Sequence, residues 1–245
     1  MLSPKSIPPE DPAVQRLSTG ELRVQGQFVW GSNYTFLVTI TDEQGELPAV
    51  YKPARGERPL WDFPARSLAR REVAAYQLSR SLGWDLVPPT VLRSDGPAGA
   101  GSLQLFVTAD PERHYFTFSH EEKQRLRPAA LFDLLINNAD RKGGHILLGE
   151  GGRVWLIDHG VCFHQDDKLR TVIWDFVGEP IPEELLEDLR RLQAGLTSRG
   201  DTYQALRPLL NRAEMAALLA RLEGLLEAGT FPGPGPGRPY PWPLV

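Results

Sequence analysis

The stretch Asn137-Asn138-Ala139-Asp140-Arg141-Lys142-Gly143-Gly144-His145, followed by Ile157-Asp158-His159-Gly160, is the part of this sequence from which the rest can be interpreted. Two short apolar runs around a Gly-rich turn separate these motifs and predict a β-hairpin. Residues at equal distances from a hairpin turn lie side by side. A turn centred on Gly151 therefore places His145 next to Asp158.

This hairpin would gather Asp140, His145 and Asp158 at one end, with His145 opposite Ile157. Two carboxylates and an imidazole suit a metal-dependent phosphoryl-transfer site. One carboxylate would face the nucleophile, and the other groups would ligate the cation that bridges the phosphates. The same residue types are common in loops, so a surface hairpin with polar ends is the alternative interpretation.

The composition predicts a folded chain whose net charge does not attract polyanions. The 245 residues suffice for one large domain or two lobes sharing a cleft, and 41% are hydrophobic. The net charge of −4 does not recruit nucleic acid or anionic lipid. The apolar runs are too short to span a bilayer, and the N-terminus has no hydrophobic signal core. The single cysteine, Cys162, excludes an intrachain disulfide and a cysteine zinc cluster, so we expect a cytoplasmic protein.

Alternating patterns predict strands in the first part of the chain, after a loose leader over residues 1–15. Strands are expected over Leu22–Trp30 and Tyr34–Thr41, joined by Gly31-Ser32-Asn33, and over Pro48–Pro53. The Gly-Ser-Asn tip could point backbone N–H groups at a phosphate, although most such tips are only turns.

Lys52 and Glu72 form a predicted ion pair. Lys52 lies at a strand end, because Pro53 cannot continue the ladder, and a solvated edge lysine is the ordinary interpretation. An apolar stripe predicts a helix over Leu68–Leu82, and Glu72 falls inside that stripe without a cation three or four positions away. An unpaired buried carboxylate is costly, so we expect Lys52 to pair with Glu72. Arg71 or a distant arginine is the alternative partner.

Strands give way to helices further along the chain. Two strands, Val87–Leu92 and Ser102–Val107, are separated by a turn over residues 94–101. The loop after the second strand suits a hinge whose backbone could contact a purine edge, although an ordinary core strand is an equally good interpretation. Helices are expected over His120–Arg127 (with Ser119 and Glu122 as a capping box), Ala129–Asn137, Pro182–Ala194, Tyr203–Leu210 and Arg212–Ala228, before an irregular Pro/Gly-rich tail over Phe231–Val245.

Six short motifs match one kinase superfamily in order. They are Val50-Tyr51-Lys52-Pro53, residues 71–76 (REVAAY), 87–90 (VPPT) and 101–107 (GSLQLFV), Asn138-Ala139-Asp140-Arg141 and Ile157-Asp158-His159-Gly160. On these motifs the chain resembles the phosphatidylinositol 3-/4-kinase-like kinases, especially type II phosphatidylinositol 4-kinases and plant ubiquitin-like-domain kinases. It is also similar to bacterial members of this superfamily. The resemblance runs from about residue 30 to 175.

The resemblance implies an α+β, bilobal protein-kinase-like fold. A β-rich N-lobe would cover residues 1–107, a mainly helical C-lobe residues 108–230, and the tail residues 231–245. It also implies ATP and Mg²⁺ as cofactors, with Mn²⁺ as an alternative. The roles that it assigns are catalysis for Asp140, Lys52 and Arg141, nucleotide binding for Ser32, Asn33, Lys52, Glu72, Gln104, Phe106 and Val107, and metal binding for Asp158 and His145.

Two positions depart from the family pattern. His145 stands where the family usually has asparagine, and imidazole suits Mn²⁺ or Zn²⁺ better than Mg²⁺. His145 could instead titrate near neutral pH and change the metal preference. The other departure is Lys142, where lipid-kinase relatives often carry histidine.

The expected acceptor is a hydroxyl of a soluble protein or small molecule rather than of a lipid. The type II lipid kinases use a cysteine-rich palmitoylated segment, whereas this chain has only Cys162, and no basic patch follows Asp158. A nucleotide-binding pseudokinase, which His145 favours, a phosphatidylinositol kinase and a nucleotidyl transferase are the alternatives. We expect neither a nucleic-acid partner nor stable membrane insertion.

Overall fold

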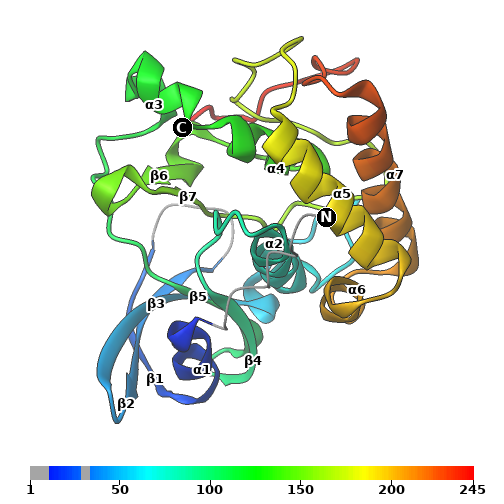
Figure 1. The fold of residues 1–245 in the computed structure, drawn as a ribbon. Helices are drawn as coiled ribbons and strands as arrows, with labels where there is room; N and C mark the ends of the chain where they lie inside the picture. The colour runs from blue at the N-terminus through cyan, green and yellow to red at the C-terminus, as the bar shows by residue number, and fades with distance from the viewer. Residues whose placement is uncertain (1–10, 29–33) are drawn as a thin grey trace.

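The computed structural model describes residues 11–28 and 34–245. An antiparallel sheet lies at one end of the molecule and most of the helices lie at the other (Figure 1). This is the predicted α+β arrangement. The exact lobe boundaries at residues 107 and 230 stay predictions.

The five strands of the sheet run in the order β1-β2-β3-β5-β4. Lys52 lies on β3, between β2 and β5, so the interpretation of an edge lysine is wrong. The observed turn between the fourth and fifth strands is shorter than the predicted turn over residues 94–101, because the chain reverses tightly at Gly99, whose φ is 96°. The strands are β1 (Glu21–Gln27), β2 (Phe36–Asp42), β3 (Gly45–Pro53), β4 (Thr90–Gly96) and β5 (Gly99–Leu105). The predicted Gly31-Ser32-Asn33 tip, with Ser32 and Asn33, lies outside the described residues.

A helix, α1 (Pro12–Thr19), takes in the last four residues of the expected loose leader, so that expectation is wrong from residue 12 onward. Asp11 caps it through a bond from the Ala13 N–H to Oδ1 (2.9 Å). Val14 and Leu17 are buried because α1 packs on the sheet.

Helix α2 (Leu68–Leu82) has the predicted bounds and connects the two parts of the molecule. It ends at Gly83, whose φ of 70° lies in the left-handed region that favours glycine. The helix packs against β4 and β5 on the sheet side, and against α5 (Glu183–Thr197) and α6 (Asp201–Leu206) on the other (Figure 1).

The remaining elements form the mainly helical part. The predicted capping box at the start of α3 is present, because the Ser119 N–H donates to Glu122 Oε2 (2.7 Å) and the Glu122 N–H to Ser119 Oγ (3.2 Å). The elements are α3 (His120–Gln124), α4 (Arg127–Ile136), β6 (Ile146–Leu148), β7 (Val154–Leu156) and α7 (Arg212–Ala228), with 3₁₀ turns at Ala54–Gly56, Tyr115–Thr117, Gly143–His145 and Glu150–Gly152. No helix within residues 11–28 and 34–245 is long and apolar enough to cross a bilayer.

The tail after α7 forms neither helix nor strand, as predicted, but it is fixed to the rest of the molecule. The Pro239 carbonyl accepts a bond from the Thr171 N–H (3.1 Å), and the Leu244 carbonyl accepts one from the Gly143 N–H (2.7 Å). The tail therefore runs back from α7 to the loop that contains Asp140.

Candidate active site

Strands β6 and β7 form the predicted hairpin. Ile146 pairs with Leu156, and the same register continues one step further, where the Ile157 N–H donates to the His145 carbonyl (3.1 Å). His145 Nε2 consequently lies 3.4 Å from Asp158 Oδ2. The register derived from the turn residues is confirmed.

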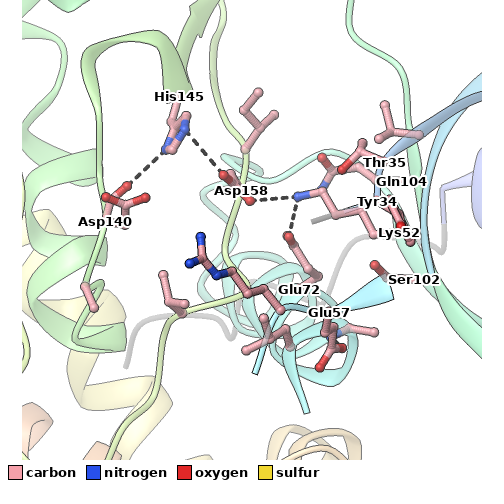
Figure 2. A pocket seen from close by; sticks show the side chains of 18 of the residues that line it. Tyr34, Thr35, Lys52, Glu57, Glu72, Ser102, Gln104, Asp140, His145 and Asp158 are labelled. Carbon is pink, nitrogen blue, oxygen red and sulfur yellow. Dashed lines mark hydrogen bonds and ion pairs between the residues drawn. The ribbon is translucent and has the colours of Figure 1, made fainter. Parts of the chain in front are cut away.

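A cleft of about 690 Å³ brings together side chains from four separate segments (Figure 2). Strand β3 contributes Lys52, α2 contributes Glu72, and the loop after α4 contributes Asp140. His145 and Asp158 flank the hairpin and complete the set.

Lys52 is held between two carboxylates. Its Nζ lies 2.5 Å from Glu72 Oε1 and 2.9 Å from Asp158 Oδ1. Burial alone would lower the pKa of Lys52, but the charges of Asp158 and Glu72 outweigh it and raise the pKa. The Lys52 ammonium in turn holds the pKa of Asp158 well below its usual range. The lysine and the aspartate are therefore both charged at neutral pH.

Glu72 connects α2 to the Ile157–Gly160 motif as well as to Lys52. Its Oε2 accepts a bond from the His159 backbone N–H (2.9 Å). Arg71 points elsewhere, pairing with Glu214 and donating to the Cys162 carbonyl (2.5 Å). The predicted Lys52–Glu72 pair is confirmed, and the alternative that Glu72 pairs with Arg71 is wrong.

Asp140 is a partly buried carboxylate with one cationic neighbour. Lys142 Nζ lies 3.2 Å from Asp140 Oδ2, and the Asp140 N–H donates to Asn138 Oδ1 (3.0 Å). Burial raises the pKa of Asp140 to about 6, and the nearby Lys142 charge opposes this rise. A carboxylate with such a pKa can accept a proton from a bound hydroxyl near neutral pH.

His145 is oriented toward Asp158 by a bond to the backbone. Its Nδ1 lies 3.0 Å from the Asp140 carbonyl oxygen, and a proton on Nδ1 would donate to that oxygen and leave the Nε2 lone pair directed at the Asp158 carboxylate. Burial lowers the pKa of His145 to about 4, so the imidazole is neutral and the expectation that it titrates near neutral pH is wrong.

The residues present fit a divalent ion with mixed nitrogen and oxygen ligands. A neutral imidazole and an ionised carboxylate are both in the form that binds metal. Within the described ranges, no group of three or more His, Cys, Asp or Glu side chains is arranged to hold a metal. Asp158 and His145 would therefore supply two ligands, and phosphate oxygens and water would supply the rest.

Arg141, predicted to be catalytic, does not reach the cleft. It is fully buried and pairs with Asp133 at 3.0 Å. Its guanidinium also donates to the Ile157 carbonyl (2.8 Å) and contacts His159 Nε2 (2.8 Å). A direct role in catalysis is therefore wrong, and Arg141 instead fixes the Asp140 loop against the Ile157–Gly160 motif.

Hydrogen bonds within the protein reduce the number of groups at the end of β5 that could contact adenine. The Phe106 N–H donates to the Pro48 carbonyl (3.0 Å), so Phe106 cannot act as a backbone donor. The Gln104 side chain donates to Thr90 Oγ1 (2.8 Å) within the sheet. Among the described residues the Val107 N–H has no partner, so the Val107 N–H stays the predicted donor for a purine edge.

The cleft contains charged residues that were not predicted from the sequence as site residues. Lys168 and Arg170 line the cleft, although the charges of residues 164–175 nearly cancel in the sequence. Lys168 pairs with Asp62, which also lines the cleft, at 3.2 Å. Arg170 lies beside the loop that contains Asp140, because its N–H donates to the Asn138 carbonyl (2.8 Å). Neither contact could be found without the long-range fold.

No family model matches the chain. The chain is 43% identical over 262 residues to Protein Rv2133c of Mycobacterium tuberculosis, and the alignment covers 93% of each protein. The chain belongs to the family of this mycobacterial protein.

Plant relatives are similar over a shorter region. Phosphatidylinositol 4-kinase gamma 4 of Arabidopsis thaliana is 31% identical over 157 residues, and that of Oryza sativa subsp. japonica is 32% identical over 150 residues. Both alignments cover 51% of this chain but only 27% and 26% of the plant proteins.

Solved kinase structures share the fold at low sequence identity. The Golgi casein kinase with Mn/ADP bound superposes with a TM-score of 0.57 and 17% identity, over 88% of this chain and 74% of that one. The Helicobacter pylori proinflammatory kinase CtkA gives a TM-score of 0.54 and 12% identity, over 88% and 94%. The predicted protein-kinase-like fold is confirmed.

Proposed function

We propose that this protein is an ATP-dependent phosphotransferase of the phosphatidylinositol 3-/4-kinase-like superfamily. The observation that carries the proposal is Lys52 Nζ held between Glu72 and Asp158, in the cleft that also contains Asp140. Kinases hold a strand lysine against the nucleotide phosphates through a helix glutamate in this way. The plant relatives, which are named as phosphatidylinositol 4-kinases, support the superfamily.

In the proposed reaction, the acceptor oxygen forms a bond to the γ-phosphorus of ATP. The bond from that phosphorus to the β–γ bridging oxygen breaks, and ADP leaves with its electron pair. The acceptor proton passes late to the Asp140 carboxylate, whose pKa of about 6 suits this transfer. Lys52 would contact the phosphates, and the Val107 N–H would bind the purine edge.

Asp158 and His145 would hold a divalent ion. A bound ion neutralises the charge on the phosphates and favours the in-line geometry of transfer. A nitrogen ligand suits Mn²⁺ better than Mg²⁺. The Mn/ADP complex of the Golgi casein kinase, a protein of the same fold, makes Mn²⁺ the first metal to test.

The proposed acceptor is a hydroxyl of a soluble protein or small molecule. Cys162 is buried, so it offers no exposed thiol for a lipid anchor. Asp62 pairs with Lys168 at the cleft, so Lys168 is not free to contact an anionic bilayer.

Incubation with γ-labelled ATP tests the phosphotransferase. We expect ATP turnover or label transfer with Mn²⁺ or Mg²⁺, and its loss in Asp140→Ala. Absence of both reactions in the wild type, with Asp140→Ala indistinguishable from it, would falsify the proposal.

A nucleotide-binding pseudokinase is the second candidate, because His145 replaces the asparagine usual in this superfamily. Thermal unfolding with and without ATP and metal separates the candidates when it is combined with the turnover assay. The enzyme requires a metal-dependent rise in the midpoint together with turnover, whereas a pseudokinase shows the rise alone.

A further inference from the structure

A second cavity, of about 750 Å³, adjoins the active-site cleft. It lies between α7, residues 165–170 and tail residues 232–239, which run close together in Figure 1. Lys168 and Arg170 line both the cavity and the cleft. The charged side chains that line the cavity are those of Lys168, Arg170, Arg221, Arg238 and Asp167.

Arg221 enters this cavity without a carboxylate partner. Its Nε donates to the Leu135 carbonyl (2.9 Å) and its Nη1 to the His164 carbonyl (3.3 Å). Its Nη2 is buried and has no hydrogen-bond partner within the described residues. Burial lowers the pKa of Arg221 to about 10, and the more distant Asp167 charge offsets this only in part. A desolvated guanidinium without a counter-ion is unfavourable, so the site favours an anion.

Two further arginines of the cavity also lack a carboxylate partner. In the described part of the chain, the Arg170 guanidinium forms neither a hydrogen bond nor an ion pair, although its backbone is bonded on both sides. Arg238 lies 6.0 Å from the Trp242 ring centroid and forms no ion pair with a carboxylate of the described residues.

The two lysines beside Asp140 and Asp158 differ from these arginines. Lys52 is paired with Glu72 and Asp158, and Lys142 is paired with Asp140. The positive charge of the second cavity is therefore an excess that the described protein groups do not neutralise. Arginine forks match phosphate oxygens in geometry as well as in charge.

We propose that the second cavity binds a small phosphate-bearing molecule, whose phosphate group is bound by Arg170, Arg221 and Arg238. The volume of 750 Å³ is that of a typical small-molecule site, for which the usual range is about 300–1,000 Å³. Among the residues that the structure describes, Asp167 is the single acidic side chain on the cavity wall, and it favours a ligand that also carries a hydroxyl or amine.

This site is connected to the catalytic loop through the backbone of Arg170. The Arg170 N–H donates to the Asn138 carbonyl (2.8 Å), and its carbonyl accepts from the Arg141 N–H (3.0 Å). The Lys168 N–H donates to Asn137 Oδ1 (2.9 Å). An anion bound to Arg170 would restrain residues on both sides of Asp140, so occupancy should slow amide exchange over residues 137–141.

Inorganic phosphate, titrated against chloride at constant ionic strength, tests the site directly. We expect a saturable rise of about 2–4 °C in the unfolding midpoint of the wild type. The Arg170→Gln/Arg238→Gln double variant should lose this rise. The matched control Arg207→Gln, which replaces an exposed arginine that lines neither cavity, should keep it.

Absence of a saturable rise in the wild type would overturn the proposal, as would an equal rise in the double variant. Arginine modification by phenylglyoxal, followed by mass spectrometry, gives a second readout that needs no variant. Phosphate should slow the modification of Arg238 and leave that of Arg207 unchanged. Equal modification of Arg238 with and without phosphate contradicts the site. None of these readouts depends on phosphotransfer.

Discussion

Two ion-pair networks meet at the loop after α4, and they differ in exposure. The cleft network consists of Lys52, Glu72 and Asp158, and the Asp158 side chain is 49% exposed. The buried network consists of Asp133 and Arg141, whose side chains are both fully buried. Asp140 and Arg141 are neighbours in sequence, yet one faces the cleft and the other belongs to the buried network.

The hydrogen bonds show why the two networks have different roles. Asp133 accepts bonds from the Asn138 amide (3.0 Å), the Arg141 Nε (3.0 Å) and the Thr171 hydroxyl (3.1 Å), so its charge is satisfied within the protein. Asp158 keeps an exposed edge that can receive a ligand. Changes in the buried network should therefore reduce stability, whereas changes at the cleft should reduce activity.

Asp140→Asn is the most direct test of whether a change at the cleft reduces activity rather than stability. Loss of the carboxylate that we propose as the acceptor of the substrate proton should lower ATP turnover by about 10²–10⁴-fold. The unfolding midpoint should change little, because the Asp140 side chain is 32% exposed and can be solvated. Turnover with γ-labelled ATP and thermal unfolding measure the two effects. Asp85→Asn, at an exposed left-handed position, is the matched control. Full turnover in Asp140→Asn would remove Asp140 from the mechanism.

Asp133→Asn should show the opposite behaviour. It leaves the Arg141 charge buried without its counter-ion, which should lower the free energy of unfolding by about 3–5 kcal/mol. Urea unfolding measures this change. The double variant Asp133→Asn/Arg141→Met removes the uncompensated charge, and we expect it to recover part of the loss. A loss below about 1 kcal/mol in the single variant would show that the buried network is not a source of stability.

The parts of the site that sequence predicts correctly depend on local geometry. The turn at Gly151 determines which residues of a short hairpin face one another, and this fixed the neighbours of His145. The helical stripe over α2 left Glu72 without a nearby cation, so a partner from another element was required. In both cases a local pattern limited the possible neighbours to a few, and the structure contains the one that was preferred.

The wrong or missing predictions depend on contacts between distant segments. Arg141 shares a motif with Asp140, but Asn137 ends α4 in the left-handed conformation and the chain turns so that Arg141 meets Asp133. The Phe106 N–H is occupied by Pro48, far away in sequence. The second cavity is formed partly by the tail, whose composition predicts only irregular structure.

Lys52→Met should affect both activity and stability, because Lys52 belongs to the cleft network but balances a buried carboxylate. Glu72, with a side chain that is 4% exposed, would keep its bond from the His159 N–H but lose its cation. We expect a loss of about 1–3 kcal/mol in unfolding free energy, together with loss of ATP turnover. Adding Glu72→Gln removes the unpaired charge. The double variant should therefore regain stability in urea unfolding while remaining inactive. A single variant with wild-type stability would contradict the coupling of these residues.

His145→Asn should have the smallest effect, and it should change metal preference rather than fold or catalytic competence. Replacing the imidazole by an amide oxygen converts a mixed nitrogen and oxygen site into an oxygen site, which Mg²⁺ prefers. The ratio of Mn²⁺-supported to Mg²⁺-supported turnover should fall by about tenfold, a change typical of altered metal-site residues. Loss of the bond from His145 to the Asp140 carbonyl should cost only about 0.5–1.5 kcal/mol in stability. His120→Asn, at an exposed position on α3, controls for loss of an imidazole. An unchanged metal ratio would mean that His145 only orients the Asp140 loop, and it would then belong with Arg141 in the positioning of the site.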